Sequence, residues 1–163
     1  MESRFKLFGH SVHQMLIVFP LGLLATAAVF DILHLLTGNP ALATVSWYII
    51  AAGVVGGLLA APPGLVDWLA IPAGTRAKAI GALHGLGNVV VLLLFAASWL
   101  IRRGLPEAPT TTALILSFAG VAIATMTGWL GGELVSRLGV GVDDGADLNA
   151  PSSLSGAARR PLA

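Results

Sequence analysis

Hydrophobic residues occur in four long runs along the chain, separated by short polar connections. The runs cover residues 15–36, 43–69, 79–101 and 112–135. A helix needs about 20 mostly apolar residues to cross a hydrocarbon core of about 30 Å, and each run meets that length. In lipid, helix is the only open-ended structure that satisfies its own backbone hydrogen bonds. The pattern therefore predicts an all-α integral membrane protein with four transmembrane helices.

The connections between the runs are short and contain glycine or proline. Short connections make consecutive helices antiparallel neighbours, so we expect an up-down-up-down four-helix bundle within residues 1–138. Pro62, Pro63 and Gly64 interrupt the second run. Because the two prolines remove amide donors, they predict a kink or a helix end near Ala61.

Basic residues distinguish the two sides of this bundle. One side carries Arg4, Lys6, Arg76, Lys78 and Arg137, and the other carries Arg102 and Arg103. The positive-inside rule then places both termini in the cytoplasm, with the bundle in a bacterial inner membrane. Residues 139–163 are poor in hydrophobic side chains and predict a disordered cytoplasmic tail. The first run is too long for a cleaved signal peptide, so we expect it to be retained.

Composition narrows the class of protein. Hydrophobic residues make up 56% of the 163 residues and charged residues only 10%, and the mean hydropathy is +0.86. The net charge is +1 and forms no basic face for nucleic acid. With no cysteine, the chain itself supplies no disulfide, thiolate ligand or thiol nucleophile. No serine lies in a nucleophile elbow, and whether the protein is an enzyme is left open.

Polar residues at membrane depth are costly and mark candidate functional positions. In the predicted topology, the start of the first and third helices and the end of the second and fourth helices share one end of the bundle. That end gathers His10, His13, Asp67, His84, Asn88 and Glu133. We expect this cytoplasmic-side cluster to be the functional site.

Two kinds of cofactor fit such a cluster. His84 together with His13 or His10 could supply the axial ligands of a b-type haem. On the third helix, Gly81, Gly85 and Asn88 share a stripe with His84, and the glycines would make room for a flat ligand. The alternative is a zinc or non-haem iron site formed by His10, His13, His84 and a carboxylate of Asp67 or Glu133. His10 and His13 are three residues apart, so both would face one side if that stretch is helical.

The same polar residues also have purely structural interpretations. Asp31 and His34 are predicted to form a hydrogen-bonded pair that locks the far end of the bundle, and Glu133 is predicted to pair with Arg137. A structural or assembly partner without a cofactor is therefore the main alternative function. A small transporter is a third, but the middle of the bundle is apolar and offers no continuous polar path.

Several short runs, taken together, resemble a known family. They are Gly9-His10-Ser11-Val12-His13, Phe19-Pro20, Gly64-Leu65-Val66-Asp67-Trp68, Ile71-Pro72, His84 with Asn88, and Gly128-Trp129-Leu130-Gly131-Gly132-Glu133-Leu134-Val135. This combination resembles the bacterial membrane proteins of the family called domain of unknown function 2231, over about residues 9–142. Members often have proline where this chain has Ser11 and Gln14, although both histidines are in place.

The resemblance implies a four-helix integral membrane protein. Some members are fused to Rieske-type iron–sulfur domains, which implies a link to membrane electron transfer and a redox partner of that type. The chain carries no such domain of its own. Homo-oligomer formation is left open.

Overall fold

The computed structural model describes residues 1–155, which form an almost entirely helical protein. A short antiparallel β-hairpin comes first, and long helices follow. The elements are β1 (Lys6–Leu7), β2 (His10–Ser11), α1 (Val12–Leu16), α2 (Val18–Thr37), α3 (Pro40–Ala70), α4 (Arg76–Arg102) and α5 (Thr111–Ser136).

Four helices are long and apolar enough to cross a membrane, and α1 and α2 together count as the first of them. The spans contain 26, 31, 27 and 26 residues. At about 1.5 Å per residue, even the shortest reaches roughly 39 Å, which exceeds a hydrocarbon core of about 30 Å. The predicted all-α membrane four-helix fold is confirmed, and the observed ends lie within a few residues of the predicted ones.

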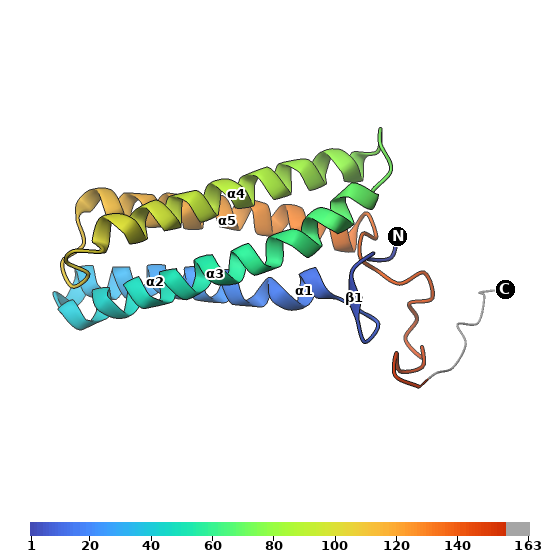
Figure 1. The fold of residues 1–163 in the computed structure, drawn as a ribbon, viewed down its shortest axis with the longest axis horizontal. Helices are drawn as coiled ribbons and strands as arrows, with labels where there is room; N and C mark the ends of the chain where they lie inside the picture. Colours follow the sequence, from blue (N-terminus) through green and yellow to red (C-terminus); the bar gives the residue numbers. More distant parts are fainter. Residues whose placement is uncertain (156–163) are drawn as a thin grey trace.

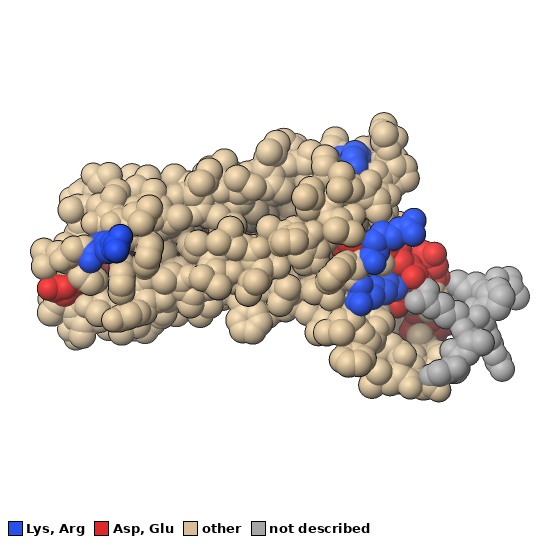
Figure 2. All heavy atoms as spheres, viewed as in Figure 1, with Lys and Arg blue, Asp and Glu red and all other residues tan. Residues whose placement is uncertain are grey.

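The helices form two helical hairpins, which we call the first hairpin (α1, α2 and α3) and the second hairpin (α4 and α5). Consecutive long helices run in opposite directions, and the two hairpins lie side by side (Figure 1). Most helix–helix contacts occur within a hairpin, and fewer join α3 to α4 or α2 to α5. The buried core between them consists of Leu24, Ala27, Ile50, Val91 and Phe95. On the face seen in Figure 2, charged side chains gather at the two ends of the bundle.

Polar caps explain where the long helices start. Asn39 accepts a hydrogen bond from the amide of Ala41 at the start of α3. Thr75 accepts from the amide of Lys78 at the start of α4. Thr110 accepts from the amide of Ala113 at the start of α5. These side chains satisfy amides that have no partner within the helix, so the chain can turn in a few residues and begin the next span.

Glycines on α3 allow close packing inside the bundle. A Cβ atom on Gly53 would lie 2.6 Å from a methyl of Leu24, and one on Gly57 would lie 2.4 Å from a methyl of Leu92. These two glycines, four residues apart on α3, let the neighbouring helices approach closely. The equivalent pair on α5, Gly128 and Gly132, differs, because a Cβ atom on either would meet no described atom within 4 Å.

Helix α3 continues through Pro62 and Pro63 to Ala70. Of the two alternatives predicted here, a kink or a helix end near Ala61, the helix end is wrong, and Asp67 belongs to the same helix as the residues before the prolines. The prolines remove two amide donors from this turn. A side chain from α1 approaches the same turn, because His13 Nδ1 lies 2.9 Å from the carbonyl oxygen of Ala60.

A buried ion pair locks the end of the bundle far from the β-hairpin. Arg102 on α4 donates two parallel hydrogen bonds to Asp31 on α2, from Nη1 to Oδ1 at 2.7 Å and from Nη2 to Oδ2 at 2.8 Å. Both side chains have 0% exposure. The predicted Asp31–His34 pair is therefore wrong, and His34 Nδ1 instead contacts the carbonyl of Asn39 at 2.9 Å.

Three buried serines complete this ion pair. Ser98 accepts from Arg102 Nε at 3.1 Å, Ser117 accepts from Nη2 at 2.9 Å, and Ser46 accepts from Nη1 at 3.4 Å. All three nitrogens of the guanidinium group thus have partners, which a buried charge requires. Because Asp31, Ser46, Arg102 and Ser117 come from four different long helices, this network joins the whole bundle.

Removing one member of the ion pair should destabilise the bundle strongly. We expect Arg102→Met to lower the free energy of unfolding by about 3–5 kcal/mol, because the Asp31 carboxylate is left buried without a partner. Asp31→Leu combined with Arg102→Met should recover most of that loss. Thermal unfolding in detergent measures both, with the exposed neighbour Arg103→Met as the control. Equal losses in the single and double variants would contradict this account.

Candidate functional site

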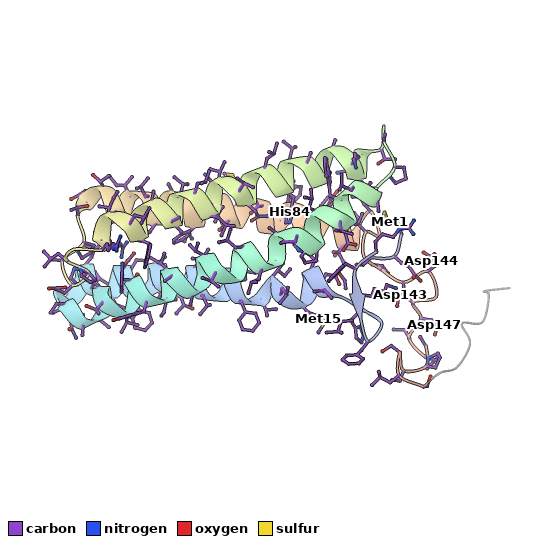
Figure 3. All side chains as sticks on the ribbon, in the orientation of Figure 1. Met1, Met15, His84, Asp143, Asp144 and Asp147 are labelled. Carbon is purple, nitrogen blue, oxygen red and sulfur yellow. The ribbon has the colours of Figure 1, made fainter. Side chains whose placement is uncertain are left out.

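Two histidines from opposite hairpins meet inside the bundle, at the end that carries the β-hairpin. His13 lies on α1 and His84 lies on α4. Their ring centres are 6.4 Å apart and the ring planes are perpendicular, at 88°. Figure 3 labels His84, which lies in the half of the bundle nearer to Met1. The prediction that topology brings these two histidines together agrees with this geometry.

A backbone carbonyl fixes each of the two imidazoles. His13 Nδ1 lies 2.9 Å from the oxygen of Ala60, and His84 Nδ1 lies 2.9 Å from the oxygen of Thr127. A carbonyl oxygen only accepts, so Nδ1 must carry the proton in both rings. In the neutral imidazole, Nε2 then holds the lone pair. Metal-ligating histidines are commonly oriented by such an Nδ1–H bond.

Glycines on the facing helices make room for the two rings. A Cβ atom on Gly64 would lie 2.7 Å from His13 Nδ1, and one on Gly131 would lie 3.1 Å from His84 Cε1. Neither glycine was among the predicted site residues. Gly81, which was, makes room for Trp68 instead, at 2.7 Å from Cδ1, and Gly85 faces no described atom within 4 Å. The imidazoles therefore lie in notches on α3 and α5.

Asn88 connects His84 to the last helix. Its Nδ2 donates to the carbonyl of His84 at 2.9 Å and lies 3.2 Å from His84 Nε2. Its Oδ1 accepts from the hydroxyl of Thr127 at 3.0 Å. Thr127 is 3% exposed. It could not be predicted as a site residue, because a threonine in an apolar run has no periodic pattern that points to a histidine on another helix.

Asp67 does not face the histidine pair as a free ligand. Its carboxylate accepts from the Ser3 hydroxyl at 2.9 and 2.7 Å, from the Arg4 amide at 2.6 Å and from the Phe5 amide at 3.4 Å. Asp67 thereby ties the N-terminal residues to the end of α3.

Glu133 pairs with a different arginine from the predicted one. Its Oε1 accepts from Arg76 Nη2 at 2.7 Å, which joins α5 to the start of α4. The predicted Glu133–Arg137 pair is wrong, because the Glu133 carboxylate is taken by Arg76 on the neighbouring helix, and Arg137 bonds Glu133 only through the backbone, from its amide to the Glu133 carbonyl.

His10 lies apart from the other two histidines. It belongs to β2, is exposed, and its Nε2 lies 3.4 Å from the hydroxyl of Ser153. The expectation that His10 and His13 face the same side assumed a helix, and the chain is extended at His10. Within residues 1–155, no group of three or more His, Cys, Asp or Glu side chains is placed to hold a metal ion.

The segment after α5 packs against the N-terminal residues. Lys6 forms ion pairs with Glu2 and with Asp143, and Asp143 and Asp144 lie close to Met1 in Figure 3. Burial opposes the charge on Lys6, but the hydrogen bonds to Asp143 and Glu2 outweigh it and raise the pKa of Lys6. Lys6 therefore stays charged at neutral pH, and this stabilisation would be lost only as the pH rises through the raised pKa. The predicted tail also includes residues 156–163, which lie outside the described residues.

The fold and the site together define a four-span membrane protein with a histidine pair between two helical hairpins. A family model described as "Predicted membrane protein (DUF2231)" matches residues 9–144. The chain belongs to this family, and the predicted resemblance is confirmed. Comparisons with curated proteins and with solved structures find no match.

Asp67→Ala should release the N-terminal residues from α3. Removing the carboxylate takes the acceptor from the Arg4 amide and one of two partners from each of the Ser3 hydroxyl and the Phe5 amide, which weakens local stability by about 1–3 kcal/mol. Hydrogen exchange at Arg4 and Phe5, followed by mass spectrometry, should then become at least about tenfold faster. The exposed carboxylate variant Glu107→Ala is the control. Unchanged exchange at Arg4 and Phe5 would show that Asp67 does not hold this segment.

Proposed function

We propose that this protein is a haem-binding membrane subunit for electron transfer, with His13 and His84 as axial ligands of a b-type haem. The single observation that carries the proposal is the histidine pair, two imidazoles from opposite hairpins with both Nδ1 atoms held by carbonyls. When bound, haem would supply reversible one-electron exchange.

The separation of the rings suits two ligands on one metal. Two metal–nitrogen bonds of about 2 Å each, with roughly 1 Å more from each nitrogen to its ring centre, span about 6 Å. The observed distance between ring centres is 6.4 Å.

The donor set fits haem better than zinc or non-haem iron. Zinc sites in proteins use three or four protein ligands, whereas a haem iron takes four nitrogens from the porphyrin and needs only two from the protein. In the described residues, Asp67 and Glu133 already have partners, and His10 lies on the β-hairpin. The histidine–carboxylate metal site is therefore the weaker proposal.

The position of the pair also favours a flat ligand. His13 and His84 lie on different hairpins, and contacts between the hairpins are fewer than contacts within them. Binding at His84 Nε2 would replace its contact with Asn88 Nδ2, while Asn88 would keep its bonds to the His84 carbonyl and to Thr127. Asn88 is thus a positioning residue in this proposal.

The membrane, the orientation of the protein in it and the redox partner are also part of the proposal. Arg102 is neutralised inside the bundle by Asp31, so Arg103 is the basic side chain left exposed on that side. The excess of basic residues at the opposite end supports cytoplasmic termini in a bacterial inner membrane. The fusions that the family resemblance implies favour a Rieske-type protein as the redox partner.

A structural or assembly partner without a cofactor is the second candidate. It is favoured by the pairing of Asp31, Asp67 and Glu133 within the chain, which accounts for the buried carboxylates without a ligand. Transport has less support, because the apolar side chains of Leu24, Ile50, Val91 and Phe95 fill the centre of the described bundle.

The haem proposal predicts a colour that depends on two histidines. Protein expressed with a haem precursor and purified in detergent should show a Soret band that shifts on reduction with dithionite. Either His13→Ala or His84→Ala should abolish it, because each removes one axial ligand. His10→Ala and His34→Ala are the matched controls and should keep the band.

Other outcomes would decide between the alternatives. Stoichiometric zinc or iron without a Soret band, measured by elemental analysis, would favour the metal site. If the purified protein binds neither and His84→Ala only lowers its unfolding temperature, the histidines are structural and the haem proposal fails.

A further inference from the structure

The β-hairpin before α1 displays apolar side chains outside the bundle. Exposed fractions are 49% for Phe5, 48% for Leu7 and 72% for Phe8. The hairpin projects sideways from the end of the bundle, so its tip lies beyond α1 rather than over it (Figure 1). None of these side chains takes part in the histidine site.

Pairing within the hairpin determines which side is apolar. Lys6 pairs with Ser11 and Leu7 pairs with His10 in antiparallel register. Successive side chains in a strand point to opposite faces, so Phe5 and Leu7 lie on the face opposite to Lys6. Lys6 is held by Asp143 and Glu2. Lys6 therefore packs on the segment after α5. On the opposite face, Gly9 and His10 approach the same segment at Ser153, while the side chains of Phe5, Leu7 and Phe8 stay about half exposed or more.

The turn keeps a phenylalanine in a conformation that it rarely adopts. Phe8 has φ 51° and Gly9 has φ 88°. Turns with positive φ at both central residues favour Asn-Gly, because bulky side chains are strained there. A phenylalanine at the first position is therefore poor for the turn itself. Its apolar side chain at the most exposed point of the hairpin indicates a role outside the hairpin.

We propose that the tip of this β-hairpin inserts into the headgroup layer of the same bilayer and anchors the start of α1. The first span of 26 residues reaches about 39 Å, close to the roughly 40–45 Å of a bilayer with its polar layers, so the hairpin falls at the interface. The apolar surface continues along the span at Met15, Val18 and Phe19, which are all exposed.

Charge at this end agrees with a lipid partner. Arg4 is exposed at this end of the bundle, where its charge can meet anionic headgroups. Aromatic side chains are enriched at the membrane interface, as are basic side chains near helix ends. This inference does not depend on haem binding, and the failure of one leaves the other intact.

The absence of cysteine makes a direct test simple. Phe8→Cys introduces a single thiol for a nitroxide label, and the protein is placed in nanodiscs of zwitterionic and anionic phospholipid. Power-saturation electron paramagnetic resonance then compares accessibility to oxygen, which concentrates in lipid, with accessibility to a water-soluble nickel chelate. The control is Leu148→Cys, whose side chain is 104% exposed on the segment after α5.

We expect the label at position 8 to be relaxed mainly by oxygen and the label at position 148 mainly by nickel. A second label, on Leu7→Cys, should become several-fold more accessible to nickel when Phe8→Asn is added, since asparagine suits the turn but removes the anchor. Equal nickel accessibility at positions 8 and 148 would overturn the proposal. So would a water-exposed label at position 8 that becomes protected only when another membrane protein is added.

Discussion

The rest of the bundle depends on the bidentate pair between Arg102 and Asp31. Lipid gives helices little hydrophobic reason to associate, so packing and polar bonds must select the partners. Here one guanidinium reaches a carboxylate on α2 and serines on α3, α4 and α5. A group with so many partners fixes rotation and depth of all four spans at one end. At the opposite end, where the histidines meet, the polar contacts are separate ones: two imidazole–carbonyl bonds, the Arg76–Glu133 ion pair and the Asn88–Thr127 bond.

The fold could be predicted from hydrophobic runs because the membrane restricts a spanning segment to a helix. The number of residues in each run also gives a helix length that can be compared with the thickness of the hydrocarbon core. Partners were harder to predict. Arg102 ends an apolar run and was counted as an exposed charge that indicates membrane orientation, although it is almost fully buried. Its partner is 71 residues away on another helix, and no spacing rule within one helix connects the two. Asp31 was instead assigned to His34, the neighbour that the helical repeat offered.

The candidate site was predicted only in part, again because contacts between helices do not follow from spacing within one helix. Topology alone placed His13 near His84, since both lie near the same end of antiparallel spans. Topology also placed His10 at this end, but it was expected to face the same side as His13 only if that stretch is helical, and the Phe8–Gly9 turn makes it a β-hairpin. The notches at Gly64 and Gly131 could not be distinguished from other glycines in an unusually glycine-rich chain. Their role depends on which ring lies opposite, and that is a property of the assembled helices.

The order of the ion-pair partners along the chain has a consequence for biosynthesis. Asp31 leaves the ribosome 71 residues before Arg102, so the first two spans are complete before the carboxylate has its partner. A lone carboxylate is costly in the hydrocarbon region. Asp31 gains its partner only when α4 has been made, so the first hairpin cannot satisfy its own buried carboxylate and depends on the second hairpin to do so.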